Sequence, residues 1–281
     1  MSPVRLIAID IDGTLLDSHF QVSEHNLATL RMAHSLGLEI VLATGRRHIF
    51  ALPVAQVLGF DAAIISSNGA ITRSADGSLF HRDPLPLAAT LELIGHMTDF
   101  RRNLVVTLDG DEAGPLVLET LDELNVSIKR WLESNARHLR FVQPIEQALQ
   151  SDPIQAMFCG TVGRMVAAQE QLLKNTALLS RITALKTQYD QRDLCMLDIL
   201  NKGCSKGAAL QRWAGDKGYE AAEVMAIGDN YNDIEMLEFA GHPYLMGNSP
   251  EDLRGGPWQM TMGNDDNGVA AAIEAALDGL I

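Results

Sequence analysis

Residues 4–15, VRLIAIDIDGTL, combine an apolar run with a short acidic turn. The run Val4–Ile9 predicts a buried strand, and Gly13 permits a tight bend after it. Asp10 and Asp12 stand two residues apart at the carboxyl end of that strand. Ligands of parallel sheets bind at this end of the strands, so the two carboxylates are the first candidates for chemistry.

The same alternation of apolar strands and helical patterns continues at both ends of the chain. Further strands are predicted at Leu38–Ala43, Ala62–Ser66, Val224–Ile227 and near Pro243–Met246. Helices are predicted between Ser23 and Gly37, and at Ile49–Leu58, Ser205–Asp216, Tyr231–Ala240 and Val269–Leu277. Strands that alternate with helices predict an α/β fold with a doubly wound parallel sheet and right-handed crossovers.

The middle of the chain has a different pattern and predicts an inserted α+β domain at residues 84–188. Its linkers would be Asp83–Pro86 and Gln188–Asp193, which leaves 1–83 and 189–281 as the catalytic core. The insert holds 10 basic and 12 acidic residues, whereas the flanking parts hold 12 and 24. Predicted elements of the insert are strands at Leu104–Leu108, His138–Val142, Ile154–Cys159 and Ile182–Lys186, and helices at Pro115–Asn125 and Met165–Lys174.

Composition excludes several classes of protein. The 281 residues, enough for about two domains, carry a formal net charge of −14, which disfavours binding to nucleic acid or to an anionic membrane. The three cysteines are widely spaced and form no CxxC motif, so buried free thiols are expected. No signal peptide or membrane-spanning run is visible, and we expect a cytoplasmic protein.

Polar motifs follow four of the predicted elements, and each has an ordinary structural explanation when taken singly. The motif at Asp10–Leu15 could be an acidic turn, Thr44-Gly45-Arg46 a helix cap, Lys206 a solvated charge, and Gly228–Asp233 a calcium-like loop or a helix cap. All four occur in one chain, and each lies near the end of an apolar strand or the start of a helix. The combination favours one shared site at the carboxyl edge of the sheet.

In this combination the chain resembles the haloacid dehalogenase-like (HAD) superfamily, in its Cof-type phosphatase branch with a type IIB cap. The resemblance extends to Ser67-Asn68-Gly69, to residues 198–206, to Met246–Ser249 and to Asn264–Val269. It implies a Rossmann-like core, a cap inserted after the third core strand, and Mg²⁺-dependent hydrolysis of phosphate monoesters. One departure is Asp198, where a longer Glu is common in the family.

The resemblance also implies roles for individual residues, and the chemistry of the motifs agrees with them. Asp10 would attack phosphorus, and Asp12 would protonate the leaving group and later activate water. Mg²⁺ would be bound by Asp10, by the main-chain carbonyl of Asp12 and by Asp229, while Asp233 would orient these ligands. The phosphoryl oxygens would be held by the Ile11 and Gly45 amides, the Thr44 hydroxyl, Lys206 and Asn232.

Several alternatives stay open at this stage. The substrate would be a small phosphorylated metabolite, such as a sugar phosphate or a phosphorylated cofactor, but a phosphosugar mutase or phosphotransferase of the same superfamily is the alternative. A phospho-accepting signalling module is disfavoured by Asp12 and by the long insert, and a non-catalytic binding protein by the complete set of catalytic positions. Haloacid dehalogenation is disfavoured because a halide needs no proton from Asp12. Arg46-Arg47 could contact substrate or be a solvated pair, and the oligomeric state is unknown.

Overall fold

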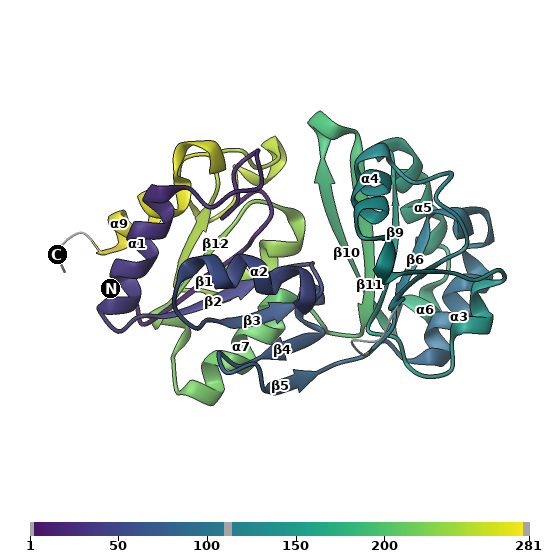
Figure 1. Cartoon of the computed structure of the whole chain (residues 1–281), viewed down its shortest axis with the longest axis horizontal. Coiled ribbons are helices and arrows are strands. Elements are labelled where there is room, and N and C mark those ends of the chain that lie inside the picture. Colours follow the sequence, from purple (N-terminus) through teal and green to yellow (C-terminus); the bar gives the residue numbers. More distant parts are fainter. Residues whose placement is uncertain (1–2, 110–113, 278–281) are drawn as a thin grey trace. The chain divides into compact units, whose positions relative to one another are not determined.

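The computed structural model describes residues 3–109 and 114–277 and divides the chain into two compact units. Unit 1 comprises residues 1–82 and 205–281, and unit 2 comprises residues 83–204. Each unit has its own sheet (Figure 1). The hydrophobic core clusters are also separate, two in unit 1 and one in unit 2 among the described residues.

Unit 1 is an eight-stranded sheet in the order β14-β13-β12-β1-β2-β3-β4-β5. All its strand pairs from β14 to β3 are parallel, and β4 and β5 extend the sheet as an antiparallel edge. The strands are β1 Leu6–Ile9, β2 Glu39–Ala43, β3 Ala63–Ser66, β4 Ile71–Arg73, β5 Leu79–Arg82, β12 Val224–Gly228, β13 His242–Leu245 and β14 Gln259–Met260.

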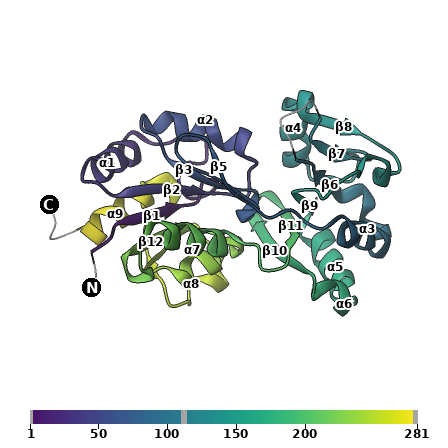
Figure 2. The ribbon, with the colours of Figure 1, turned by 90° about the horizontal axis from the view of Figure 1, so that it is seen from below.

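Helices cover both faces of this sheet, as expected for a doubly wound fold (Figure 2). The helices are α1 Glu24–Ser35, α2 His48–Leu58, α7 Lys206–Lys217, α8 Ile234–Phe239 and α9 Gly268–Leu277. Side chains of α1, α2 and α9 pack in one core cluster, and those of α7 and α8 pack in the other. The predicted α/β fold with a parallel sheet is confirmed, and β1 is fully buried at its centre.

Unit 2 has a mixed six-stranded sheet in the order β10-β11-β9-β6-β7-β8, in which only the β7–β8 pair is parallel among the described pairs. Its strands are β6 Leu104–Thr107, β7 Leu116–Leu118, β8 Leu139–Phe141, β9 Gln155–Gly160, β10 Ile182–Tyr189 and β11 Leu194–Asn201. Its helices are α3 Leu87–His96, α4 Val126–Ser134, α5 Val162–Leu173 and α6 Thr176–Leu179. The inserted part is therefore α+β, as predicted.

Two predictions for this part are wrong. The helix predicted at Pro115–Asn125 is instead strand β7 followed by a turn, because Leu116–Leu118 is buried between β6 and β8. The linker predicted at Gln188–Asp193 lies at the tight connection between β10 and β11, which pair over their whole length. Because β11 also pairs with β9, residues 189–204 belong to unit 2 and not to the core.

Cys159, Cys195 and Cys204 are buried free thiols. Within the described ranges, every helix is too short or too polar to cross a membrane.

Candidate active site

Parallel strands bring the candidate residues to one edge of the sheet of unit 1. Strand β1 lies between β12 and β2, and both pairs are parallel. Asp10 follows β1, Thr44 follows β2 and Asp229 follows β12. Side chains that are far apart in sequence therefore meet at the carboxyl ends of three adjacent strands, where such sheets bind ligands.

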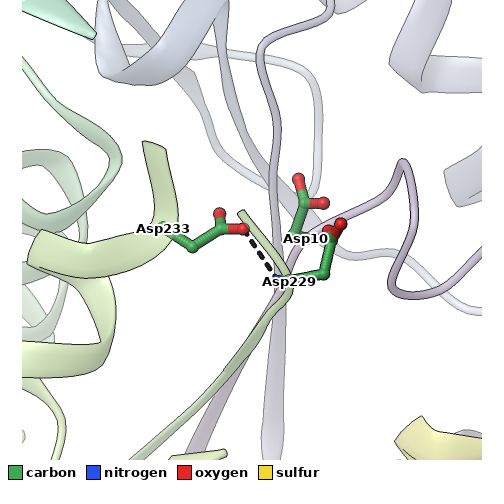
Figure 3. A group of neighbouring side chains, drawn as sticks. All are labelled: Asp10, Asp229 and Asp233. Carbon is green, nitrogen blue, oxygen red and sulfur yellow. Dashed lines mark hydrogen bonds between the residues drawn. The ribbon is translucent and has the colours of Figure 1, made fainter. Parts of the chain in front are cut away.

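Three carboxylates form a buried cluster at this edge (Figure 3). Asp10, Asp229 and Asp233 each offer an oxygen, and these three atoms lie within 4.8 Å of one another. The residues are 4%, 2% and 0% exposed, respectively. Carboxylates concentrated in this way out of water require a cation, because their mutual repulsion is poorly screened.

Lys206 supplies one positive charge to the cluster. It is the first residue of α7, a helix capped by the Ser205 hydroxyl, which accepts a hydrogen bond from the Ala208 amide. The Lys206 ammonium is 1% exposed and donates to Asp10 Oδ1 at 2.5 Å and to Asp233 Oδ1 at 2.7 Å. The alternative that Lys206 is a solvated charge is therefore wrong.

The charges of the cluster shift the proton affinities of its members. Burial raises the pKa of Asp10 to about 7; Lys206 opposes this rise, and the neighbouring Asp233 and Asp12 carboxylates add to it. Burial, together with Asp10 and Asp233, also raises the pKa of Asp229 well above its ordinary value. Burial alone would lower the pKa of Lys206, but Asp10 and Asp233 hold it above its usual range.

The donor set fits a hard divalent cation. Three carboxylates against one ammonium leave two negative charges in a buried site, which matches the charge of one Mg²⁺ ion. Burial is the largest cause of the raised pKa values of Asp10 and Asp229, and the neighbouring carboxylates add to it. The cluster thus has the charge and the oxygen donors that suit a metal site.

The loop after Asp10 is shaped to approach Asp229. Gly13 has φ +87°, and a Cβ at this position would lie 2.5 Å from Asp229 Oδ2, so only glycine fits. The Thr14 hydroxyl donates to Asp229 Oδ1 at 3.0 Å. These contacts fix one oxygen of Asp229 and hold the bend that carries Asp12.

Asp233 differs from Asp10 and Asp229 in its hydrogen bonds. Its Oδ2 accepts from the amides of Asp229 and Asn230, both at 3.0 Å, and its Oδ1 accepts from Lys206. Both oxygens are thus already hydrogen bonded. This arrangement supports the predicted role of Asp233 in orienting the ligand shell that includes Asp229, although that role stays a prediction.

Asp12 lies outside the three-carboxylate cluster and is paired with Arg46. The guanidinium is bidentate: Nε donates to Asp12 Oδ2 at 2.7 Å and Nη2 to Oδ1 at 2.5 Å. Both side chains are partly exposed. The sequence left the role of Arg46 open. Its signal was its place directly after Thr44-Gly45, in the loop that follows β2, the strand next to β1.

The predicted phosphate-binding residues lie around the same edge. The Thr44 hydroxyl oxygen accepts from the Arg46 amide at 3.1 Å, which leaves its proton available to a ligand. Gly45 follows Thr44, Ile11 lies between the two aspartates, and Asn232 lies in the 3₁₀ turn after β12. Their phosphate contacts stay predictions.

Two asparagines from the motifs at 246–249 and 264–269 support the loop that carries Asp12. Asn248 Nδ2 donates to the Gly13 carbonyl at 2.8 Å, and Asn264 Nδ2 donates to the Leu16 carbonyl at 2.9 Å. Asn248 Oδ1 also accepts from the Asn264 amide at 3.0 Å. Asn248 and Asn264 thus hold the loop that follows β1.

Comparison with known proteins agrees with this geometry. A family model described as haloacid dehalogenase-like hydrolase matches residues 7–273. The chain belongs to this family. The resemblance inferred from the motifs is confirmed, including the Cof-type branch of subclass IIB.

Relatives cover nearly the whole chain. Phosphatase YwpJ of Bacillus subtilis is 29% identical over 282 residues, with 95% of this chain and 98% of that protein covered. HMP-PP phosphatase of Escherichia coli is 30% identical over 251 residues, covering 89% and 86%. The structure of a HAD subclass IIB sugar phosphatase, BT4131, matches with a TM-score of 0.79 at 21% identity and covers 99% and 100% of the two chains, which shows the shared fold. The chain is a phosphatase of the HAD superfamily.

Proposed function

We propose that this HAD phosphatase hydrolyses phosphate monoesters of small metabolites in a Mg²⁺-dependent reaction through an aspartyl-phosphate on Asp10. The observation that carries the proposal is the buried ion pair of Asp10 and Lys206 beside Asp229. A carboxylate held by one ammonium at the ligand-binding edge of the sheet has the place and the charge of a nucleophile.

The first step transfers the phosphoryl group to the enzyme. An oxygen of Asp10 bonds to phosphorus, the bond from phosphorus to the leaving oxygen breaks, and Asp12 gives that oxygen its proton. Lys206, the Thr44 hydroxyl, the Ile11 and Gly45 amides and Asn232 would hold the phosphoryl oxygens. A metal held by Asp10, Asp229 and the Asp12 main-chain carbonyl would neutralise charge on the transferring group.

The second step returns the enzyme to its starting state. Asp12 takes a proton from water, the water oxygen bonds to phosphorus, and the bond from phosphorus to Asp10 breaks. Inorganic phosphate leaves, and Asp12 is again protonated for the next cycle. The bidentate Arg46 fixes the plane of the Asp12 carboxylate, and because both carboxylate oxygens accept from the guanidinium, we propose that this contact opens when Asp12 carries the proton.

The proposed substrate class is supported by the names of two similar proteins. The relatives include an HMP-PP phosphatase, and a structural neighbour is a sugar phosphatase. We propose a sugar phosphate or a phosphorylated cofactor as substrate, with unit 2 selecting the leaving group because every proposed catalytic residue lies in unit 1. A screen of phosphorylated metabolites with Mg²⁺, scoring both free phosphate and isomerised product, tests this against the phosphosugar mutase alternative. Isomerised product without phosphate release would overturn the phosphatase proposal.

Replacing Asp12 with asparagine should impair the two steps unequally. An alkyl phosphate needs a proton on its leaving oxygen, so its first step should slow by about 10²–10⁴-fold in D12N. The p-nitrophenolate of p-nitrophenyl phosphate leaves without a proton, so a burst of nitrophenol should persist while steady turnover falls. Stopped-flow measurement of both esters checks this, and an equal loss of the first step with both would argue against an acid role for Asp12.

Metal binding should depend on pH in a defined direction. The pKa of Asp10 is raised to about 7, and that of Asp229 is also raised. At pH 6 a metal ion must therefore displace protons from these carboxylates, whereas at pH 8 part of these protons has already dissociated. The affinity for Mg²⁺ should therefore increase by about tenfold from pH 6 to pH 8.

Calorimetric titration at the two pH values measures this without any substrate. An affinity for Mg²⁺ that is the same at both pH values would contradict the assignment of Asp10 as a ligand.

Chelation should also abolish turnover, and Mg²⁺ should restore it where Ca²⁺ does not, since Ca²⁺ prefers a larger and looser ligand shell.

A further inference from the structure

The connection between β3 and β4 is a buried 3₁₀ turn, Ser67–Gly69, with a left-handed backbone. Ser67 has φ 49° and Asn68 has φ 52° and ψ 32°, although neither is glycine. Such conformations are disfavoured for residues with a side chain, less so for asparagine, and persist where the surroundings impose them. Ser67 is 2% exposed and Asn68 is fully buried.

The backbone of this turn holds the loop that carries Gly45. The Ser67 amide donates to the Arg46 carbonyl at 2.8 Å, and the Asn68 amide donates to the Thr44 carbonyl at 3.0 Å. These two hydrogen bonds bracket Gly45 on both sides. The position of its amide therefore depends on the turn after the neighbouring strand.

The side chain of Asn68 contacts two of the predicted phosphate-binding groups. Its Oδ1 accepts from Asn232 Nδ2 at 2.9 Å. A Cβ built on Gly45 would lie 3.3 Å from both Oδ1 and Nδ2 of Asn68, so the carboxamide of Asn68 packs against Gly45. One buried side chain thus links the end of β2 to the turn after β12.

The same turn also packs against the helix that begins with Lys206. Gly69 has φ +102°, and a Cβ there would lie 2.2 Å from the carbonyl oxygen of Ser205, the capping residue of α7. The turn therefore contacts three elements that carry proposed phosphate-binding groups: the Gly45 loop, Asn232 and the start of α7.

We propose that Asn68 is a positioning residue for phosphate binding, which acts by fixing the Asn232 carboxamide and the Gly45 amide. The acceptor Oδ1 of Asn68 makes Asn232 present its nitrogen on that side and leaves the second N–H of Asn232 for a phosphoryl oxygen. Without this acceptor the carboxamide can turn and present its oxygen to an anion, which repels it. The inference rests on the proposed function, because it concerns the same phosphate site.

Substitution of Asn68 by glycine isolates the side chain, because glycine adopts positive φ readily and keeps the turn. The control is N267G: Asn267 also has positive φ (60°), and its Oδ1 accepts a hydrogen bond from the Ser23 hydroxyl, but it takes no part in the phosphate site. Melting temperatures are measured first. N68S is a second variant, since Ser67 already tolerates positive φ in this turn and a serine hydroxyl is shorter than the carboxamide.

The test uses the full chain with Mg²⁺, the best ester from the screen, and inorganic phosphate as a competitive inhibitor. N68G should raise both KM and the inhibition constant of phosphate by about tenfold, with a smaller loss in kcat, and N267G should change neither. In an N232A background N68G should add less than the tenfold effect that it has alone, because the part that acts through Asn232 is already lost and only the part that acts through Gly45 is left. Effects that multiply in the double variant, or unchanged phosphate inhibition in N68G, would overturn the proposal.

The two levels of inference fail differently. A folded wild-type chain that releases phosphate from no ester would contradict the proposed function. If the wild type is active and phosphate inhibits N68G and N68S as strongly as it inhibits the wild type, only the role of Asn68 is contradicted.

Discussion

The variant D10N should lose steady turnover by about 10⁴-fold or more while it keeps its fold. An amide has almost the shape of the carboxylate but cannot form an acyl phosphate by the same route. Asp10 is 4% exposed and its pKa is raised to about 7, so the fold gains little from its negative charge. The melting temperature should therefore stay within about 3 °C of the wild-type value.

The matched control is D61N, the same substitution at an exposed aspartate of unit 1. It should leave both activity and melting temperature unchanged. Phosphate release from the best ester, followed over hours with purified protein, measures the residual rate. Steady hydrolysis by D10N above about one hundredth of the wild-type rate would exclude Asp10 as the nucleophile.

The variant K206M should lose both activity and stability. Lys206 is 1% exposed and is the cation that pairs with Asp10 and Asp233, so its removal leaves two buried carboxylates without their partner. Breaking a buried pair in this way costs about 3–5 kcal/mol of the free energy of unfolding. Turnover should fall by about 10³-fold, because a positive charge next to the phosphoryl group is lost.

The pH dependence of this destabilisation has a predictable sign. Carboxylates that lose their cation bind protons more tightly in the folded state, so the loss of stability in K206M should be smaller at pH 5 than at pH 8. The control is K217M, at the exposed end of the same helix, which should change the free energy of unfolding by less than about 1 kcal/mol. Urea unfolding of the metal-free proteins at both pH values tests this, and equal stability of K206M and wild type at pH 8 would contradict the buried ion pair.

The sequence predicted the core of unit 1 well because its signals are local. The apolar run Leu6–Ile9 ends at an acidic turn that contains Gly13, which favours a buried strand, and the polar residues directly after it then lie at the strand end. Asp10, Thr44 and Asp229 could be placed together for this reason, before any contact was known.

The errors arose where the structure depends on pairing between distant segments. Leu116–Leu118 is short enough to suit a strand or a helix, and its place between β6 and β8 decides the matter. The polar stretch at 188–193 has the composition of a linker and equally of a hairpin turn, and only the pairing of β10 with β11 distinguishes them.

The site residues that could not be predicted act through neighbours rather than through their own motif. The sequence does not distinguish Arg46 from a solvated arginine. Its pairing with Asp12 follows from the register of β1 with β2, which brings the loops after the two strands together. Asn68 lies in an ordinary turn sequence, and its bond to Asn232 spans 164 residues of sequence. Both contacts become visible only when the strand ends are brought together.

The central claim is that Asp10 carries the phosphoryl group, and one measurement addresses it directly. D12N, which should accumulate the intermediate, is mixed with p-nitrophenyl phosphate and Mg²⁺, quenched with acid and treated with borohydride, which reduces an acyl phosphate to an alcohol. Mass spectrometry of the peptide that contains residue 10 should then show homoserine in place of Asp10, in proportion to the nitrophenol burst. A full burst with Asp10 unmodified, or with the modification at another residue, would contradict the account.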